Sequence, residues 1–288
     1  MPRKIQKQHK KRFTSGEPPN FLGQHFMHNK KVIREIIDKA HIGEDETVVE
    51  LGAGTGAITF HLAERAGKVL AVEYDAKLVA VLRQKAMQYP NLTIIHQDIL
   101  QMRLPKGKFI VVSSIPYSIT TPIMKMLLNK PSTGFQRGVI VMEKGAAKRF
   151  TAKFVKDSYV AAWRMYFDIN CVKEISRYHF SPPPKVDSAI ITIKRKAPPI
   201  VPIKDYVTFR GLADYVLKEP RASVDWALSG VFTPPQIAYL KRKLGMKRDV
   251  PVACLTELQW GIIFETMVQH VPRCKWPKVK KKNGTIFE

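Results

Sequence analysis

Hydrophobic positions in the first half of the chain follow two alternating patterns. Short runs of consecutive apolar residues are typical of strands buried in a parallel sheet, whereas apolar residues that recur every three or four positions indicate a helix. The predicted strands are 47–51, 68–72, 92–96, 109–113 and 138–142, and the predicted helices are 28–40, 58–66, 78–87 and 122–129. This alternation predicts a doubly wound α/β fold with a parallel sheet.

The pattern changes in the second half of the chain. Two further strands are predicted at 167–172 and 189–194, and the proline-rich segment 179–185 between them must be extended. Beyond them only helical periodicity remains, and prolines interrupt it. The predicted parts are a basic N-terminal arm (1–19), an α/β domain (20–196), a small helical domain (197–272) and a basic tail (273–288).

The charge balance narrows the class of partner. The chain has 288 residues, with 48 Lys and Arg against 24 Asp and Glu, so its formal net charge is +24. An excess of this size points to polyanions, which are nucleic acids or anionic membranes. No apolar run reaches the roughly 20 residues that span a bilayer, so we expect no membrane segment and favour nucleic acid. Residues 1–12 are basic and have no apolar stretch typical of secretory signals.

The cysteines argue against a metal or disulfide framework. Cys171, Cys254 and Cys274 stand far apart and form no CxxC pair. They support neither a disulfide network nor a zinc site, so we expect no metal. A reducing, cytoplasmic location fits this cysteine usage best.

A glycine-rich turn, Gly52-Ala53-Gly54-Thr55-Gly56, follows the first predicted strand. Glycines there let the backbone turn sharply and let a ligand approach the main chain. Together with Ala57, they also satisfy the G-x-G-x-x-G/A pattern of dinucleotide sites. Glu73 ends the next strand, where an acid accepts hydrogen bonds from a ribose. The turn predicts either a nicotinamide cofactor or S-adenosylmethionine, with a purely structural turn as the alternative.

Two acidic residues favour S-adenosylmethionine. Glu50 directly precedes the turn, where a carboxylate can orient a cationic aminoacyl group. Asp98 follows the third strand, where it can accept a hydrogen bond from an adenine amino group. A nicotinamide oxidoreductase remains an alternative for the turn, but it gives no account of the next motif.

The segment Ser114-Ile115-Pro116-Tyr117 follows the fourth predicted strand and suits methyl transfer to an adenine amine. The lone pair of that nitrogen is delocalised into the ring, so acceptors have to hold both N–H groups. The Ser114 side chain and the Ile115 carbonyl are the predicted acceptors. Pro116 keeps the turn rigid, and Tyr117 offers an aromatic face to a flipped base. Phe180 is a candidate for the other face, with a core position as the alternative. Catalysis by positioning requires no general base.

With these motifs the chain resembles the Erm class of 23S ribosomal RNA adenine-N6 methyltransferases, which confer resistance to macrolides, lincosamides and streptogramin B. The resemblance runs from about Gly16 to Trp276. It rests on Glu73 and on the segments 19–25, 50–56, 97–100, 114–117, 143–150 and 179–188.

The resemblance implies a site and a set of partners. Asn20 and Leu22 would form part of the cofactor pocket, and Gly52 would lie against the methionine portion. Glu73 would bind the ribose, and Asp98 the cofactor adenine. It further implies a Rossmann-like seven-stranded sheet, a helical RNA-binding domain, and two methyl groups on one adenine near the nascent-peptide tunnel. The implied partners are S-adenosylmethionine and 23S rRNA before ribosome assembly is complete, and the protein is expected to be a monomer.

One position departs from the family pattern, which has Asn where this chain has Ser114. Serine offers a hydroxyl acceptor on a shorter arm. Because the Asn of the family also touches the cofactor, Ser114 is a candidate for both catalysis and cofactor binding. The change bears on the rate and on the second methyl transfer rather than on the fold.

Two alternatives share the same scaffold. One is a 16S rRNA dimethyltransferase, but residues 143–150 favour the Erm class because they lack the Ala-x-Pro-Gly segment usual in the alternative. The other is a catalytically weak RNA-binding protein, in which Ser114 in place of the family's Asn would be the reason for the weak catalysis. The basic residues Lys144, Lys148 and Arg149 fit RNA contact and a solvated surface equally well.

Overall fold

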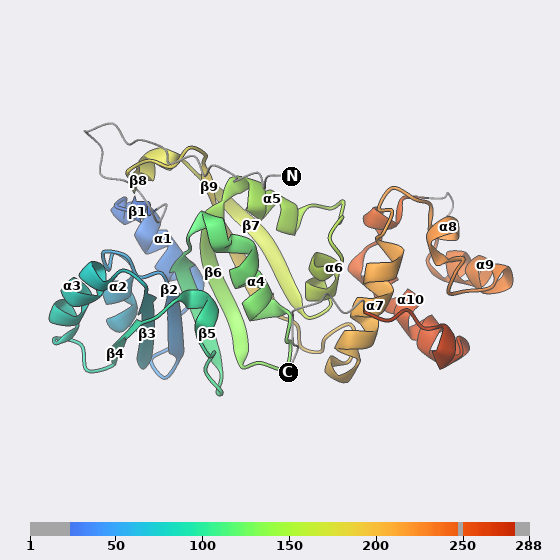
Figure 1. Cartoon of the computed structure of the whole chain (residues 1–288), viewed down its shortest axis with the longest axis horizontal. Coiled ribbons are helices and arrows are strands. Elements are labelled where there is room, and N and C mark those ends of the chain that lie inside the picture. Colours follow the sequence, from blue (N-terminus) through green and yellow to red (C-terminus); the bar gives the residue numbers. More distant parts are fainter. Residues whose placement is uncertain (1–23, 247–249, 280–288) are drawn as a thin grey trace, which may run out of the picture.

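The computed structural model describes residues 24–246 and 250–279. Along the chain, the strands of the main sheet mostly alternate with helices (Figure 1). The strands are β1 (Phe26–Met27), β2 (Thr47–Leu51), β3 (Lys68–Glu73), β4 (Leu92–His96), β5 (Phe109–Ser114), β6 (Phe135–Glu143), β7 (Phe167–Ile175), β8 (Phe180–Ser181) and β9 (Ser188–Arg195). The helices are α1 (Lys30–Ala40), α2 (Thr59–Ala63), α3 (Ala76–Ala86), α4 (Thr120–Leu128), α5 (Lys144–Thr151), α6 (Ser158–Arg164), α7 (Tyr206–Val216), α8 (Val224–Leu228), α9 (Pro234–Lys243) and α10 (Glu257–His270).

Seven strands form one sheet in the order β4-β3-β2-β5-β6-β9-β7. The five strands from β4 to β6 are parallel, whereas β9 runs antiparallel to both of its neighbours. The expected seven-stranded Rossmann-like sheet is therefore confirmed. The sequence order reverses between β2 and β5, and such a reversal opens a crevice at the carboxyl ends of the strands.

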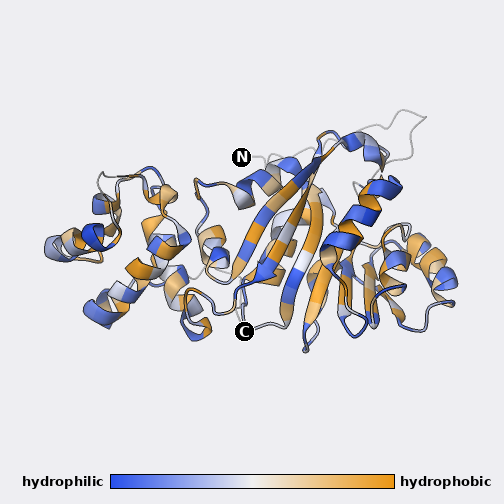
Figure 2. Ribbon diagram, turned by 180° about the vertical axis from the view of Figure 1, so that it is seen from behind, coloured by the Kyte–Doolittle hydropathy of each residue, from blue (hydrophilic) through white to orange (hydrophobic). Residues whose placement is uncertain are grey.

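Helices cover both faces of the sheet. Successive side chains of a strand point to opposite faces, so a run of apolar residues needs a cover on each side. Val48 belongs to a buried cluster with α1, α2 and α3, whereas its neighbour Val49 belongs to a second cluster with α4, α5 and α6. In Figure 2 the hydrophobic colour dominates the central strands and alternates with the hydrophilic colour along the helices. Burial on both faces explains why these strands read as continuous apolar runs in the sequence.

The C-terminal helices α7 to α10 lie beyond α6, outside the β7 edge of the sheet (Figure 1). Their buried residues belong to the same hydrophobic cluster as the sheet and α4 to α6. The backbone N–H of Val155 also donates to the carbonyl of Ala253 at 2.8 Å, and the Lys196 ammonium lies 3.4 Å from the Glu257 carboxylate. The helical region predicted at 197–272 is thus present and packs closely on the sheet; the boundary itself stays a prediction.

The structure differs from the hydrophobic pattern in three places. Helices α5 and α6 were not predicted, and β1 pairs with β8 in a separate two-stranded sheet. The segment 179–185 forms a strand only at Phe180–Ser181: His179 ends a 3-10 turn that Ser176 caps, and bends follow at 182 and 185. The basic arm 1–19 and most of the tail 273–288 lie outside the described residues.

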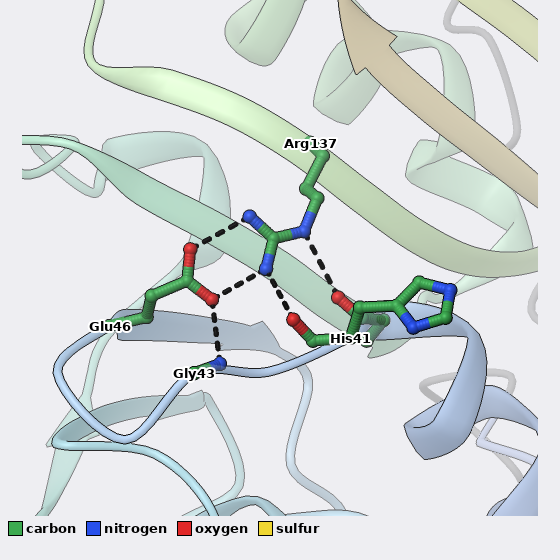
Figure 3. A network of polar contacts seen from close by, with 5 residues as sticks. His41, Gly43, Glu46 and Arg137 are labelled. Atoms are coloured by element: carbon green, nitrogen blue, oxygen red, sulfur yellow. Dashed lines mark hydrogen bonds and ion pairs between the residues drawn. The ribbon is translucent and has the colours of Figure 1, made fainter.

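A half-buried arginine on β6 ties the C-terminal end of α1 to the sheet (Figure 3). Arg137, on β6, donates to both carboxylate oxygens of Glu46 and to the main-chain carbonyls of Ala40 and His41. His41 ends α1 in the left-handed region, at φ 46°. The bidentate contact holds the pKa of Glu46 below its usual value.

Among the described residues, no helix is long and apolar enough to cross a membrane.

Candidate active site

A pocket of about 260 Å³ lies at the carboxyl ends of β2, β3, β4 and β5. This is the edge at which doubly wound sheets bind their ligands. Each strand contributes the residues that follow its last apolar position, and the segment before β1 closes the pocket. The lining residues are Gln24, His25, Phe26, Gly52, Gly54, Glu73, Tyr74, Asp98, Ile99, Ser114, Ile115, Pro116, Tyr117, Ser118 and Ile119. The predicted cofactor turn and the predicted target-base loop therefore share one cavity.

The glycine turn adopts a backbone that side chains would strain. Gly52 and Gly54 have φ values of +87° and +57°. A Cβ on Gly54 would lie 3.1 Å from Cδ1 of Phe26, and one on Gly52 would lie 3.4 Å from Cδ of Pro116. Glycine is therefore required at both positions, and the main chain is what the turn presents to a ligand.

Glu73 is held at the pocket by three main-chain hydrogen bonds. One carboxylate oxygen accepts from Gly54 N–H at 2.8 Å, and the other accepts from Tyr74 and Asp75 N–H at 2.9 Å. A carboxylate can accept about four hydrogen bonds, so capacity for a ligand hydroxyl remains. Asp98 lines the same pocket and accepts from Leu100 N–H at 2.9 Å. Both acids are thus oriented before a ligand arrives.

Glu50 lies beneath the glycine turn and is only 1% exposed. Burial raises the pKa of its carboxyl group to about 8; the nearby Thr59 hydroxyl opposes this shift, and the charge of Glu73 adds to it. Among the described residues, its Oε2 atom has no hydrogen-bond partner. A buried acid with an unpaired oxygen fits a cofactor that carries positive charge, as S-adenosylmethionine does.

The target-base loop begins where β5 ends. Ser114 is the last residue of β5, and Ile115, only 2% exposed, donates its N–H to the Val141 carbonyl of β6 at 3.0 Å. Tyr117 follows Pro116 and lines the pocket, with its hydroxyl hydrogen-bonded to the Ser188 hydroxyl of β9. Burial raises the pKa of Tyr117, and the Ser188 contact opposes that shift.

The pocket wall also includes His25 and Phe26, to which the sequence analysis gave no individual role. His25 lies with its ring centroid 5.9 Å from that of Tyr117, and its Nδ1 is 2.8 Å from the Pro182 carbonyl. Phe26 pairs with Ser181 across the two-stranded sheet. Their signal was weak, because the sequence shows no periodicity that would bring residue 26 to residue 181.

The structure does not bring every expected residue to the pocket. Phe180 is only 2% exposed, packs with Met27 in the cluster beneath α1, and is absent from the pocket lining. Its backbone helps to place His25 and Phe26, whereas its ring is a core position. Asn20 and Leu22 lie outside the described residues. The remaining expected residues, Gly52, Gly54, Glu73, Asp98, Ser114, Ile115 and Tyr117, all line the cavity.

Comparisons with known proteins place this geometry in a family. A family model for ribosomal RNA adenine dimethylase matches residues 19–269. The rRNA adenine N-6-methyltransferase of Bacillus licheniformis is 58% identical over 287 residues, which is 99% of this chain and 100% of that protein. The ribosomal RNA small subunit methyltransferase A of Staphylococcus haemolyticus is 32% identical over 218 residues, which is 71% of this chain and 73% of that protein. The structure of the 23S rRNA methyltransferase ErmE superposes with a TM-score of 0.76 at 26% identity, over 85% of this chain and 100% of that one.

These findings confirm the expected reaction class and cofactor. The family model spans both the glycine turn and the target-base loop, and the similar Bacillus protein extends over nearly the whole chain. The protein is an rRNA adenine N6-methyltransferase, and its cofactor is S-adenosylmethionine. In sequence and in fold, the chain belongs to the ribosomal RNA adenine dimethylase family.

Proposed function

We propose that this enzyme methylates N6 of one adenine in 23S rRNA, up to the dimethylated base, and thereby confers resistance to macrolides, lincosamides and streptogramin B. The observation that carries the reaction is the single cavity shared by the glycine turn and the loop Ser114–Tyr117. The choice of 23S rRNA is supported by the match to ErmE over 85% of the chain. It is also supported by residues 143–150, which lack the Ala-x-Pro-Gly segment of the 16S enzymes.

The cofactor half of the cavity positions the donor. When bound, S-adenosylmethionine supplies an activated methyl group. In this proposal the main chain of Gly52 and Gly54 contacts its methionine portion, and Glu73 accepts from the ribose hydroxyls. Asp98 accepts from the adenine amino group of the cofactor. Because main-chain N–H groups already fix both carboxylates, little reorganisation is needed on binding.

The other half positions the target amine. The Ser114 hydroxyl and the Ile115 carbonyl accept the two N–H groups, so that the nitrogen lone pair turns out of the ring and toward the methyl group. Tyr117 stacks on the flipped base, and its ring is held by Ser188. His25, near Tyr117, replaces Phe180 in our proposal as the side chain opposite the base. The proton leaves to water after transfer, so positioning supplies the catalysis.

A 16S rRNA target is the second candidate. The small subunit methyltransferase A proteins of Staphylococcus haemolyticus and Bacillus thuringiensis are 32% and 36% identical to this chain over 71% and 65% of its length. They use the same scaffold, so the catalytic pocket does not discriminate between the two RNAs. The proposal otherwise includes a monomer acting in the cytoplasm on 23S rRNA before ribosome assembly is complete, with the helical region 197–272 adding RNA contacts.

Labelled S-adenosylmethionine and protein-free rRNA test the proposal directly. The protein is incubated with naked 23S rRNA and, separately, with naked 16S rRNA, and the labelled nucleotide is mapped. Label on one adenine of 23S rRNA is the expected result. Label only in 16S rRNA would select the second candidate, and label in neither RNA would contradict both.

A further inference from the structure

Tyr178 is an exposed aromatic residue on the turn that precedes β8. It is 67% exposed, and no other Tyr, Trp or Phe among the described residues is as exposed. An aromatic ring of this exposure contributes little to the hydrophobic core, because most of its surface stays in water. Its position is therefore better explained by contact with something outside the chain.

The backbone that carries Tyr178 is fixed on both sides. Asp187 accepts from the Arg177 N–H at 3.1 Å, and the Ser176 hydroxyl accepts from the Tyr178 N–H at 3.4 Å. Beyond it, the His179 carbonyl accepts from the His28 N–H at 3.1 Å. The turn that carries the ring is thus anchored, so little additional backbone would have to be ordered when a ligand binds there.

Positive charge accompanies the ring. The Arg177 guanidinium lies 5.2 Å from the centroid of Tyr178, and its Nη1 donates to the Lys185 carbonyl at 3.1 Å. Within residues 24–246 and 250–279, neither Arg177 nor Lys185 forms an ion pair with a carboxylate. An exposed aromatic ring beside an arginine that has no carboxylate partner is a combination that binds a base and its phosphate in single-stranded RNA.

The turn is continuous with the wall of the active-site pocket. Two residues after Tyr178, the chain enters β8, whose partner strand β1 begins with the pocket residue Phe26. The Pro182 carbonyl, just beyond β8, contacts His25, which also lines the pocket. The turn that carries the ring is therefore linked, through β8 and Pro182, to the side of the cavity formed by His25 and Phe26.

We propose that Arg177 and Tyr178 form a stacking platform for an unpaired nucleotide adjacent to the target adenine, with Arg177 contacting its phosphate. The inference rests on the proposed function, since it assumes that RNA enters this pocket. The platform would hold the strand after its adenine has left the stack, so that the flipped state becomes less costly.

Fluorescence of 2-aminopurine tests the platform without methyl transfer. A short single-stranded RNA with one adenine carries 2-aminopurine at the preceding or the following nucleotide, and it is titrated with the full-length protein. We expect quenching at one of these two positions with the unmodified protein and with Tyr178→Phe, but not with Tyr178→Ala. The Ala variant should also bind RNA about tenfold more weakly, within the range measured for loss of one stacked base.

Tyr239→Ala provides the matched control, because Tyr239 is 44% exposed on α9 and distant in sequence from the pocket segments. It should leave the quenching unchanged. Equal quenching with Tyr178→Ala and the unmodified protein would overturn the platform, as would equal losses in the Tyr178→Ala and Tyr239→Ala variants. The 2-aminopurine assay measures binding and not methyl transfer. A missing rRNA label would therefore contradict the proposed reaction, whereas the platform is judged by the quenching alone.

Discussion

The hydroxyl group of Tyr117 is hydrogen-bonded to the hydroxyl group of Ser188, so the antiparallel strand β9 holds the aromatic ring of the target-base loop. Ser188 is fully buried and pairs with Glu143 of β6 and with Ile175 of β7. The ring orientation is therefore set by a residue that is buried and paired with strands on both sides. A stacking surface fixed in this way pays little rotamer entropy when a base arrives.

Removing either hydroxyl of this pair should slow methyl transfer. We expect Ser188→Ala and Tyr117→Phe each to lower the single-turnover rate by about tenfold, the upper range for loss of one hydrogen bond. The double variant should be no slower than the slower single variant, because both changes remove the same contact. Rate losses that multiply in the double variant would show that Ser188 does not act through Tyr117.

Tyr117→Ala removes the ring itself. We expect the rate of transfer to fall by about a hundredfold, near the upper limit for loss of a stacked base, while cofactor affinity stays within a few-fold. Equilibrium binding of S-adenosylmethionine, measured by calorimetry, separates the two effects. A parallel loss of rate and cofactor affinity would argue against base stacking.

Ser114→Asn tests the acceptor at the start of the loop. The longer amide side chain also offers a carbonyl oxygen, so activity should be maintained or raised, and the proportion of dimethylated adenine should not fall. Ser114→Ala is the matched variant without an acceptor and should be slower. Mass spectrometry of the modified adenine distinguishes one methyl group from two. Elimination of transfer by Ser114→Asn would make our acceptor assignment wrong.

Glu50 predicts a pH dependence of stability. Burial raises its pKa from 4.5 to about 8 in the folded state, so the folded protein holds a proton that the unfolded chain loses above pH 4.5. The contribution of Glu50 to the free energy of unfolding is therefore fully present below pH 4.5 and decreases as the pH rises to about 8. Chemical denaturation across this range should show a flatter profile for Glu50→Gln.

Glu46→Gln is the control for that profile. The contact with Arg137 lowers the pKa of Glu46, so its contribution has the opposite sign: it is present above pH 4.5 and lost as the pH falls. Glu46→Gln should destabilise the protein at neutral pH and leave the slope between pH 5 and 8 unchanged. An unchanged slope in Glu50→Gln would contradict the pKa assigned to Glu50.

The central sheet and most of the pocket were predictable because they depend on local patterns. The parallel strands are buried on both faces, so they appear as apolar runs, and β3 and β5 end at the pocket residues Glu73 and Ser114. Helix α6 was missed because Val160, Ala161, Ala162 and Trp163 are all buried and leave no helical period to detect. Helix α5 was also missed, because it is short and rich in Lys and Arg and therefore shows few apolar positions.

The remaining part of the site depends on contacts distant in sequence. Phe26 and Ser181 are paired across two-residue strands, which are too short to show alternation. For the same reason the sequence left two positions open for Phe180, and the fold directs its ring into the core. No local rule decides which face of such a strand meets the pocket.

A single hydrophobic cluster continues from the sheet into the C-terminal helices, so we expect the two regions to fold and unfold together. Tyr166 packs edge-on against Tyr206, and Phe209 packs likewise against Trp260 and Phe264. A chain cut after residue 196 would leave the sheet with an uncovered apolar flank prone to aggregation. We therefore expect one unfolding transition for the whole enzyme, and C-terminal truncations that inactivate it by misfolding even where they remove no RNA contact.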